Sequence, residues 1–413
     1  MDLLRFITAG SVDDGKSTLI GRLLYDTDSI KVDQLETILK QSKNKSEGEI
    51  DLALFTDGLR AEREQGITID VAYKYFATEK RKFIIADAPG HIQYTRNMVT
   101  GASNSDLIII LVDARLGVIE QTRRHSIIAS LLQIPHVVVT INKMDMVNFS
   151  EEVYNTIVAD YSKMADMLKI TDVTFIPISA LNGDNIVNPS INTPWYKGET
   201  LLNLLETINI SNDINYEESR FPVQFVIRPQ SEDLHDYRGY AGKVLSGTYK
   251  KGDVVTILPD GIDSTIKAVE VHGIEVDEAF APQSAVIRLT DDIDINRGDL
   301  IVKKSNILKV SQEIEATLCW MDNKPLVVGN KYLLQVQSKR VRCVIKEINY
   351  KLDVNTLEKQ EQFDQVGLND VVHVLIKTAS PIAYDSYNTL RANGGAILID
   401  ETAHTTVAGC MLS

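Results

Sequence analysis

Gly10-Ser11-Val12-Asp13-Asp14-Gly15-Lys16-Ser17 fits the pattern G-x-x-x-x-G-K-[ST], whose glycines let the backbone curl around phosphate groups. A β-branched run, Leu3 to Ala9, precedes it, and a helical pattern, Lys16 to Tyr25, follows it. In this order, the backbone N–H groups at the start of the helix face the ligand. The stretch therefore predicts a phosphate-binding loop that extends to Thr18, in which Lys16 reaches the β and γ phosphates and Ser17 can ligate Mg²⁺.

Short β-branched runs alternate with helical patterns from the N-terminus to about residue 207. The predicted strands are Leu3 to Ala9, Lys82 to Ala86, Asp106 to Asp113, His136 to Ile141 and Val173 to Ile178. The predicted helices are Lys16 to Tyr25, Gln93 to Gly101, Gln121 to Leu132, Glu151 to Leu168 and Glu199 to Ile208. Because hydrophobicity in the strands is nearly continuous, we expect a mostly parallel, doubly wound sheet covered on both faces. The sequence thus predicts an α/β P-loop domain over residues 1–210.

The pattern changes from Arg220 onward to short alternating strands separated by Gly, Asp and Asn turns. Turns recur about every 8–12 residues and helical patterning is absent, which is typical of a β-barrel or a β-sandwich. The polar stretch 209–219 is predicted to be a linker, and a second boundary falls near Asn306. We expect two β-barrel domains, over residues 220–306 and 307–413.

A second functional pattern, Asp87-Ala88-Pro89-Gly90, follows the predicted strand Lys82 to Ala86. An aspartate at the end of such a strand can hold Mg²⁺ through its water shell, and the N–H of Gly90 can reach the γ-phosphate. A lone D-x-x-G is only a turn in most proteins. Its place at a strand end downstream of a phosphate loop favours the functional interpretation.

The residues Asn142-Lys143-Met144-Asp145 end another predicted strand and are expected to select the base. The Asp145 carboxylate can accept hydrogen bonds from guanine N1–H and the 2-amino group, whereas adenine lacks both donors and would leave a charged acceptor unpaired. Asn142 would fix the loop or bind the N7 side, and the stem of Lys143 would cover the base plane. A further stretch would add a backbone N–H for guanine O6, namely Ser179-Ala180-Leu181. These patterns predict GTP rather than ATP in this pocket.

Two further residues are candidates for the chemical step. Thr68, in the polar segment between Tyr25 and Asp70, could ligate Mg²⁺ and sense the γ-phosphate, so that this loop closes on the triphosphate and is released after hydrolysis. His91 follows Gly90, where its ring could orient the attacking water by hydrogen bonding. Since phosphoryl transfer depends mainly on positioning and charge, the predicted catalytic residues are Lys16, Thr68 and His91.

The composition limits the possible classes of protein. A formal net charge of −14 over 413 residues argues against a generally basic, DNA-binding surface. The longest apolar runs, such as Leu107 to Val112, are far shorter than the roughly 20 residues that span a bilayer, and the N-terminus runs directly into a strand pattern. Three widely spaced cysteines without a CxxC pair predict buried, reduced thiols. We therefore expect a cytoplasmic protein that binds neither DNA nor membrane.

Several stretches resemble those of a known protein family. Glu62 to Asp70, Asp87 to His91 and Asn97-Met98, followed by two barrels, resemble the translational GTPases typified by elongation factor Tu. Within that family, the whole chain is most similar to the large, GTPase subunits of bacterial heterodimeric sulfate adenylyltransferases. The closer resemblance lies in Ser11 to Leu24, Gln93 to Met98, Gln121 to Ser126, Cys319 to Met321, Leu352 to Leu357 and Leu368 to Asp370.

This resemblance implies a reaction that uses two nucleotides. GTP hydrolysis would drive adenylyl transfer from ATP to sulfate on a separate, small ATP-handling subunit, giving adenosine 5′-phosphosulfate and pyrophosphate. It also implies a heterodimer, or a higher assembly of heterodimers, with that subunit. Some relatives carry an adenylylsulfate kinase after the third domain, but no second P-loop pattern precedes Ser413, so we expect no kinase activity.

The alternative interpretation is a carrier that delivers aminoacyl-tRNA to the ribosome, with GTP hydrolysis as the release timer. Translation factors usually have histidine where Asp14 stands and glutamate where Arg124 stands. These two differences, together with the matches in the third domain, favour the sulfate adenylyltransferase interpretation, and tRNA is a partner only under the alternative.

Overall fold

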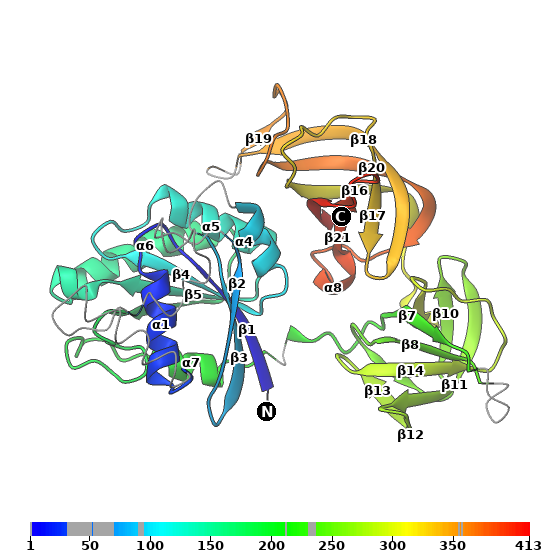
Figure 1. Ribbon diagram of the computed structural model, residues 1–413, viewed down its shortest axis with the longest axis horizontal. Helices are drawn as coiled ribbons and strands as arrows, with labels where there is room; N and C mark the ends of the chain where they lie inside the picture. The colour runs from blue at the N-terminus through cyan, green and yellow to red at the C-terminus, as the bar shows by residue number, and fades with distance from the viewer. Residues whose placement is uncertain are drawn as a thin grey trace. The chain divides into compact units, whose positions relative to one another are not determined.

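The computed structural model describes residues 2–30, 52, 70–89, 95–210, 213–229, 237–353, 356 and 358–413. Three residues that were predicted for the site lie outside the described residues, namely Thr68, Gly90 and His91. The larger part of the chain divides into two compact units, one with residues 1–210 and the other with residues 211–353 and 358–413 (Figure 1). The limits of the three domains at 210, 220–306 and 307–413 stay predictions.

The first unit is built on a six-stranded sheet in the order β2-β3-β1-β4-β5-β6. Its strands are β1 (Asp2–Ala9), β2 (Ala72–Ala77), β3 (Arg81–Asp87), β4 (Leu107–Asp113), β5 (His136–Asn142) and β6 (Val173–Pro177). Neighbouring strands pair in parallel except β2, which is antiparallel to β3. Every residue of β4 is buried, as expected for a central strand covered on both faces. The predicted mostly parallel α/β sheet is confirmed.

Helices follow the strands as the sequence predicts, with ends that differ by a few residues. They are α1 (Lys16–Asp26), α4 (Thr95–Ala102), α5 (Glu120–Leu131), α6 (Glu151–Met167) and α7 (Leu201–Thr207), with a 3-10 turn, η3 (Met144–Val147). Leu19, Ile20 and Leu23 of α1 are fully buried among residues of the sheet and of α7. This spacing places them on one face of α1, so that the helix packs directly over the strands and fixes the loop before it.

One strand, β2, lies outside the strand ranges predicted from the sequence. Of its six residues, AYKYFA, only Phe76 is buried, and exposed positions alternate with half-buried ones at Ala72 to Tyr75. A strand at the edge of a sheet does not have to be apolar throughout, because one of its sides is open. Its sequence therefore lacks the continuous hydrophobicity that identified the central strands.

The second unit contains two closed β-barrels (Figure 1). The first is a ring of six strands in the order β10-β15-β7-β8-β14-β11, closed by pairing of β11 with β10. Its strands, with three shorter ones attached to the barrel or paired beside it, are β7 (Phe221–Ile227), β8 (Gly239–Lys243), β9 (Thr248–Lys250), β10 (Val254–Leu258), β11 (Ile262–Val271), β12 (Ile274–Val276), β13 (Glu278–Phe280), β14 (Ser284–Leu289) and β15 (Leu300–Lys303).

The second barrel is a ring in the order β17-β21-β22-β16-β20-β18, closed by β17 and β18. Its elements are η6 (Lys304–Asn306), β16 (Val310–Trp320), β17 (Lys331–Val336), β18 (Lys339–Leu352), β19 (Lys359–Gln360), β20 (Val371–Ala383), α8 (Arg391–Gly394), β21 (Gly395–Ile399) and β22 (Thr406–Leu412). The two predicted barrels are confirmed. The predicted absence of helix after Arg220 is wrong at α8, whose four residues are too few to produce a helical period.

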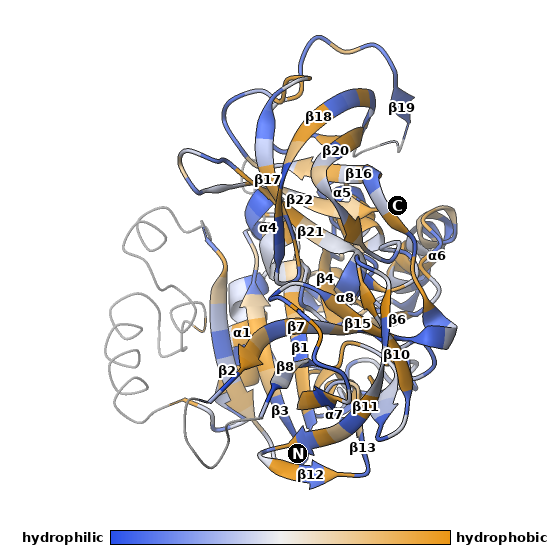
Figure 2. Ribbon diagram, turned by 90° about the vertical axis from the view of Figure 1, so that its right-hand side faces the viewer, coloured by the Kyte–Doolittle hydropathy of each residue, from blue (hydrophilic) through white to orange (hydrophobic). Residues whose placement is uncertain are grey.

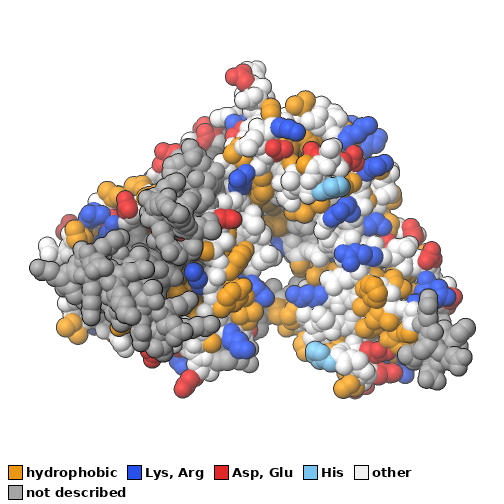
Figure 3. All heavy atoms as spheres, in the orientation of Figure 1, with side chains coloured by type: hydrophobic (Ala, Val, Ile, Leu, Met, Phe, Trp, Pro, Cys, Tyr) orange, Lys and Arg blue, Asp and Glu red, His pale blue; other side chains and the backbone are white. Residues whose placement is uncertain are grey.

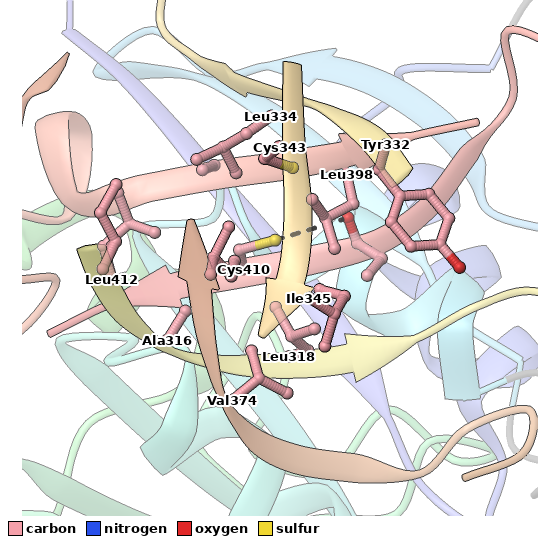
Figure 4. Packing of buried hydrophobic residues seen from close by; sticks show 14 of the residues in the cluster. Ala316, Leu318, Tyr332, Leu334, Cys343, Ile345, Val374, Leu398, Cys410 and Leu412 are labelled. Carbon is pink, nitrogen blue, oxygen red and sulfur yellow. Dashed lines mark hydrogen bonds between the residues drawn. The ribbon is translucent and has the colours of Figure 1, made fainter. Parts of the chain in front are cut away.

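The three cysteines are free thiols inside the barrel unit. Cys343 and Cys410 lie in the core of the second barrel beside Leu334 and Leu398 (Figure 4), and Cys319 is also buried. Burial raises the pKa of Cys319 and of Cys343 to about 12 and that of Cys410 well above its usual value. These groups are therefore apolar core residues, as predicted.

A buried ion pair joins the two barrels. Arg220 Nε lies 2.8 Å from Asp385 Oδ2, and Arg220 Nη2 lies 2.9 Å from Asp385 Oδ1, with 3% and 4% of the two side chains exposed. Asn393 Nδ2 donates to Asp385 Oδ2 at 2.8 Å, and Arg220 Nη1 donates to the carbonyls of Ser219 and Asn306. Because both charges are paired and hydrogen-bonded away from water, this contact fixes one barrel against the other.

Hydrophobic and charged residues are distributed unevenly over the molecule. Hydrophobic residues concentrate along the strands, while many connecting loops are hydrophilic (Figure 2). On the face drawn in Figure 3, Lys and Arg side chains gather over the barrel unit, although the whole chain has a formal net charge of −14. Within the described ranges, no helix is both long and apolar enough to cross a membrane.

Candidate functional site

The phosphate loop connects the end of β1 to the start of α1. Gly15 precedes α1 with a φ of 92°, a left-handed conformation that suits glycine. A Cβ atom at this position would also lie 2.5 Å from Nδ2 of Asn142, so a side chain is excluded on two grounds. Among the described residues, no acidic side chain lies in the first turn of α1 and none caps it, so its N–H groups can face an anion.

The Lys16 ammonium group lies inside this loop. Its Nζ donates to the carbonyl oxygens of Gly10 at 2.9 Å and Ser11 at 3.1 Å, and the residue is buried. Burial lowers the pKa of Lys16, while the carboxylates of Asp87 and Asp14 oppose that shift. A buried cation gains strongly from a phosphate group beside it.

Asp87 ends β3, next to the strand that leads into the phosphate loop. It pairs in register with Thr8 of β1, whose Oγ1 donates to Asp87 Oδ1 at 3.3 Å. The N–H of Ala88 donates to the carbonyl of Thr8 at 3.3 Å, which fixes the turn toward Pro89. The buried carboxylate of Asp87 is close enough to Lys16 to raise the pKa of that lysine. Carboxylate and hydroxyl oxygens at this edge are the kind of ligand that Mg²⁺ prefers.

The Asn142 side chain joins the phosphate loop to a second loop. Its Nδ2 donates to the carbonyl of Asp14 at 2.7 Å, and its Oδ1 accepts from the N–H of Ala180 at 2.9 Å. Only 2% of Asn142 is exposed. Both ends of the amide are therefore engaged within the protein, which favours the role of a loop brace over a contact with the N7 side of a base.

Lys143 extends from the end of β5 back to the phosphate loop. Its backbone has a φ of 62°, and its Nζ donates to the carbonyl of Asp13 and lies 3.0 Å from Asp113 Oδ2. The aliphatic stem is thus held in one direction, where it can cover one side of a flat base.

Asp113 and Arg115 belong to the site but were not among the predicted residues. Asp113 ends β4 in register with Asn142 and accepts hydrogen bonds from Arg115 Nε at 3.0 Å and Nη2 at 2.6 Å. Burial alone would raise the pKa of Asp113, but the hydrogen bonds from Arg115 and Lys143 outweigh it and lower that pKa to about 2. Asp113 is therefore an ionised anchor for Lys143. Its place at a strand end, the same signal that identified Asp87, could have revealed it.

The turn η3 holds the proposed base-selecting residue. Asp145 is half-buried in η3, whereas the side chain of Met144 is fully buried in the core. The N–H of Met144 donates to the carbonyl of Ile178 at 3.2 Å, which ties η3 to the end of β6. Met144 therefore supports the loop, and the Asp145 carboxylate is the polar group that this turn can offer to a ligand.

The loop after β6 is held from two sides. Ser179 is buried, and its Oγ accepts from the N–H of Asn182 at 3.3 Å. Arg22 of α1 donates through Nε to the carbonyl of Ala180 at 3.3 Å and through Nη2 to that of Leu181. With the Ala180 N–H bonded to Asn142, this loop is fixed both to β5 and to α1.

Helix α5 places a neutral histidine near the phosphate loop. His125 is buried, and burial, followed by the charges of Lys16 and Arg124, lowers its pKa to about 3. Arg124 is 8% exposed, and its Nη2 lies 3.4 Å from Glu120 Oε1. The structure therefore brings the predicted residues at the ends of β1, β3, β5 and β6 together at one edge of the sheet, while Thr68, Gly90 and His91 lie beyond the described residues.

Comparisons with known proteins agree with this geometry. The sequence matches the family description "Elongation factor Tu GTP binding domain" over residues 1–211 and "GTP-eEF1A C-terminal domain-like" over residues 313–413. The Ski7 GTPase-like domain of S. cerevisiae, whose crystal structure is bound to GTP, matches with a TM-score of 0.53 and 18% identity, over 100% of this chain and 97% of that chain. At that identity, the match supports the fold alone.

Relatives of much higher identity cover nearly all of the chain. A Pseudoalteromonas atlantica protein named sulfate adenylyltransferase subunit 1 is 52% identical over 100% of this chain and 87% of its own length. A Mycobacterium tuberculosis protein named bifunctional enzyme CysN/CysC is 51% identical over 99% of this chain and 67% of its own length. The predicted resemblance is confirmed, and the interpretation as a tRNA carrier is disfavoured. The chain belongs to the elongation factor Tu-like GTP-binding proteins and, within them, to the sulfate adenylyltransferase subunit 1 family.

Proposed function

We propose that this chain is the GTPase subunit of a sulfate adenylyltransferase. In this assembly, GTP hydrolysis drives the formation of adenosine 5′-phosphosulfate and pyrophosphate from ATP and sulfate on a partner subunit. The observation that carries the proposal is the 52% identity over the whole chain to a relative of that name. The loops at the ends of β1, β3, β5 and β6 supply the matching chemistry, because together they would form one pocket with a phosphate end and a base end.

The pocket would hold GTP through five groups. Asp145 would accept from guanine N1–H and the 2-amino group, and Lys143 would cover the base. Since the Ala180 N–H is bonded to Asn142, the backbone donor for guanine O6 would come from Leu181. The N–H groups at the start of α1 and the Lys16 ammonium group would bind the β and γ phosphates.

Magnesium would be held at the phosphate end by oxygen ligands. Ser17, in the first turn of α1, would bind it directly, and Asp87 would bind it through water. Thr68 would complete the ligand set and sense the γ-phosphate, a role that rests on the sequence pattern. The buried Asp87 carboxylate, which accepts a hydrogen bond from Thr8 at the edge of the sheet, is the observation that supports a magnesium ion here. The ion would neutralise charge on the transferred phosphoryl group.

Hydrolysis needs a water molecule in line with the bond that breaks. His91 would orient that water by hydrogen bonding, and the water oxygen would bond to the γ-phosphorus while its proton passes to an oxygen of the phosphate formed. The bond to the β-phosphate oxygen would break, which leaves GDP and phosphate. Lys16 would balance the charge that moves onto the leaving oxygen. The protein's part is therefore positioning and charge rather than covalent catalysis.

His91→Ala should separate binding from chemistry. We expect GTP affinity to stay within a few-fold of the wild type, while hydrolysis stimulated by the partner slows by about 10²-fold or more, the usual scale for a positioned catalytic group. Single-turnover hydrolysis with radiolabelled GTP, measured with the partner present, checks this. An unchanged rate would remove His91 from the mechanism.

The adenylyl transfer itself belongs on the partner. The sequence contains one G-x-x-x-x-G-K-[ST] pattern, and the base-selecting carboxylate beside it favours guanine, so this pocket is unsuited to ATP. The chain alone should therefore hydrolyse GTP slowly and form no adenosine 5′-phosphosulfate.

Reconstitution tests the proposed function. The partner is first identified by copurification with the native protein and mass spectrometry, and the two subunits are then mixed with ATP and sulfate. We expect GTP turnover to rise and adenosine 5′-phosphosulfate to accumulate beyond the level that ATP and sulfate reach without GTP. Thr68→Ala should still bind nucleotide but lose this GTP-dependent gain, whereas the control Lys16→Ala should lose GTP binding itself.

Two results would contradict the proposal. If Thr68→Ala drives product to the wild-type level, the proposed role of Thr68 is wrong. If the wild type ignores sulfate and retains charged tRNA in a filter-binding assay, the chain is a tRNA carrier instead.

A further inference from the structure

The side chain of Asp14 folds back into the phosphate loop. Its Oδ2 accepts a hydrogen bond from the N–H of Ser11 at 2.5 Å, and its own N–H donates to the carbonyl of Ser11 at 3.3 Å. Only 2% of Asp14 is exposed. The loop thus contains a buried carboxylate that is tied to its own first turn.

The surroundings of Asp14 hold it in this place. Its carbonyl accepts from Asn142 Nδ2 at 2.7 Å, so the residue is fixed at both its backbone and its side chain. A Cβ atom added to Gly10 would lie 3.3 Å from Asp14 Oδ2 and 3.1 Å from Leu111 Cβ, so the carboxylate packs over Gly10 at the end of β1. The missing side chain of Gly10 is what leaves room for Asp14.

The carboxylate and the Lys16 ammonium group converge on the same two residues. Lys16 Nζ bonds the carbonyls of Gly10 and Ser11, and Asp14 Oδ2 bonds the N–H of Ser11. Burial raises the pKa of Asp14, and the hydrogen bond from Ser11 and the charge of Lys16 act in the opposite direction. The negative charge of the Asp14 carboxylate therefore offsets part of the attraction that Lys16 could offer to a phosphate group.

The hydrogen bond to Ser11 does not need a charge. An asparagine amide has the same shape and could accept from the same N–H through its oxygen. The loop could therefore keep this conformation without the negative charge of Asp14. In a loop that binds the phosphates of a nucleotide, such a charge acts against the ligand.

We propose that Asp14 is a positioning residue that holds the phosphate loop through Ser11 while its charge weakens the binding of GDP and speeds its release. This inference rests on the proposed GTP site. Since one charge in a partly buried phosphate-binding loop changes the affinity for an anion by about 10-fold or more, the effect is large enough to alter the release rate.

Two uncharged variants separate the charge from the hydrogen bond. Asp14→Asn keeps the acceptor for Ser11 and should bind GDP about 10-fold tighter than the wild type, with slower release. Asp14→Ala loses the acceptor as well and should bind GDP more weakly than Asp14→Asn, because the loop is no longer held. Asp28→Asn, at an exposed residue just after α1, is the matched control for loss of one negative charge.

The experiment measures the dissociation rate and affinity of a fluorescent GDP analogue by stopped flow at low and high salt. The gain in Asp14→Asn should persist at high salt, because a buried charge is screened little, whereas any effect of the exposed control Asp28→Asn should fade. Asp14→Ser, also uncharged and with an oxygen acceptor, should release GDP more slowly than the wild type and serves if the asparagine variant fails to fold.

Three outcomes would overturn the inference. GDP release from Asp14→Asn as fast as from the wild type removes the charge effect and leaves the proposed function standing. A gain of equal size in Asp28→Asn assigns the effect to net charge rather than to Asp14. A wild type that binds no guanine nucleotide overturns both the inference and the proposed function.

Discussion

Asp145→Asn should lose GTP and gain xanthosine triphosphate. The carboxylate can accept both from N1–H and from the 2-amino group of guanine, whereas an amide presents one acceptor and one donor. The amide donor would face the 2-amino group of guanine, but it matches the 2-oxo group of xanthine. Because a buried polar group without a partner is penalised heavily, we expect GTP affinity to fall by about 10²-fold or more.

Titration calorimetry with GTP, xanthosine triphosphate and ATP measures this change. Asp166→Asn is a suitable control, since Asp166 lies exposed on α6 and undergoes the same chemical change outside the pocket. A variant at position 145 that keeps the guanine preference of the wild type would show that the base is selected elsewhere. Equal affinity of the wild type for ATP and GTP would contradict the assignment of the pocket itself.

Asp385→Ala should destabilise the barrel unit strongly. The substitution leaves the Arg220 guanidinium group buried without its carboxylate, and it also removes an acceptor from Asn393. Removal of one partner of a buried ion pair typically costs about 3–5 kcal/mol, far more than the pair contributes relative to apolar residues. Replacement of both charges, as in Arg220→Met with Asp385→Leu, should therefore cost less than the single change.

Tryptophan fluorescence can report this loss within the barrel unit. The sequence has two tryptophans, and a Trp195→Phe background leaves Trp320, which is buried in the second barrel. Urea unfolding followed at Trp320 should shift to a lower midpoint in Asp385→Ala. The control is Asp292→Ala, which breaks a pair with Arg238 whose aspartate is 81% exposed, and should cost less than about 1 kcal/mol. Similar shifts in the two variants would mean that the junction is no stronger than a surface contact.

Much of the first unit could be predicted from the sequence because its signals are local. The strand before Gly10 and the helix from Lys16 follow from hydrophobic runs and a helical period. The parallel sheet follows from the nearly continuous hydrophobicity of segments such as β4, which the structure shows to be buried throughout. Asn142 shows the limit of prediction from such local signals. Its position was predictable, but its choice between the loop and the base depends on Asp14 and Ala180, which come from other segments.

The remaining features depend on residues that meet only in the folded chain. Arg220 and Asp385 are separated by 165 positions, and neither has a neighbouring pattern that points to the other. The place of Asp113 at the end of a strand could be predicted from the sequence nearby. Its partner Lys143, however, follows the next strand. Long-range pairs of this kind are set by tertiary packing rather than by local propensity.

The buried thiols of the barrel unit have a consequence for site-specific labelling. A maleimide or an oxidant reacts with the thiolate, and a thiol whose pKa is about 12 supplies almost none at neutral pH. Cys319, Cys343 and Cys410 are also 3 to 5% exposed, so reagents have little access to them. A single cysteine placed at an exposed position such as Ile191, which is 92% exposed, would therefore take up a fluorophore without prior removal of the native cysteines.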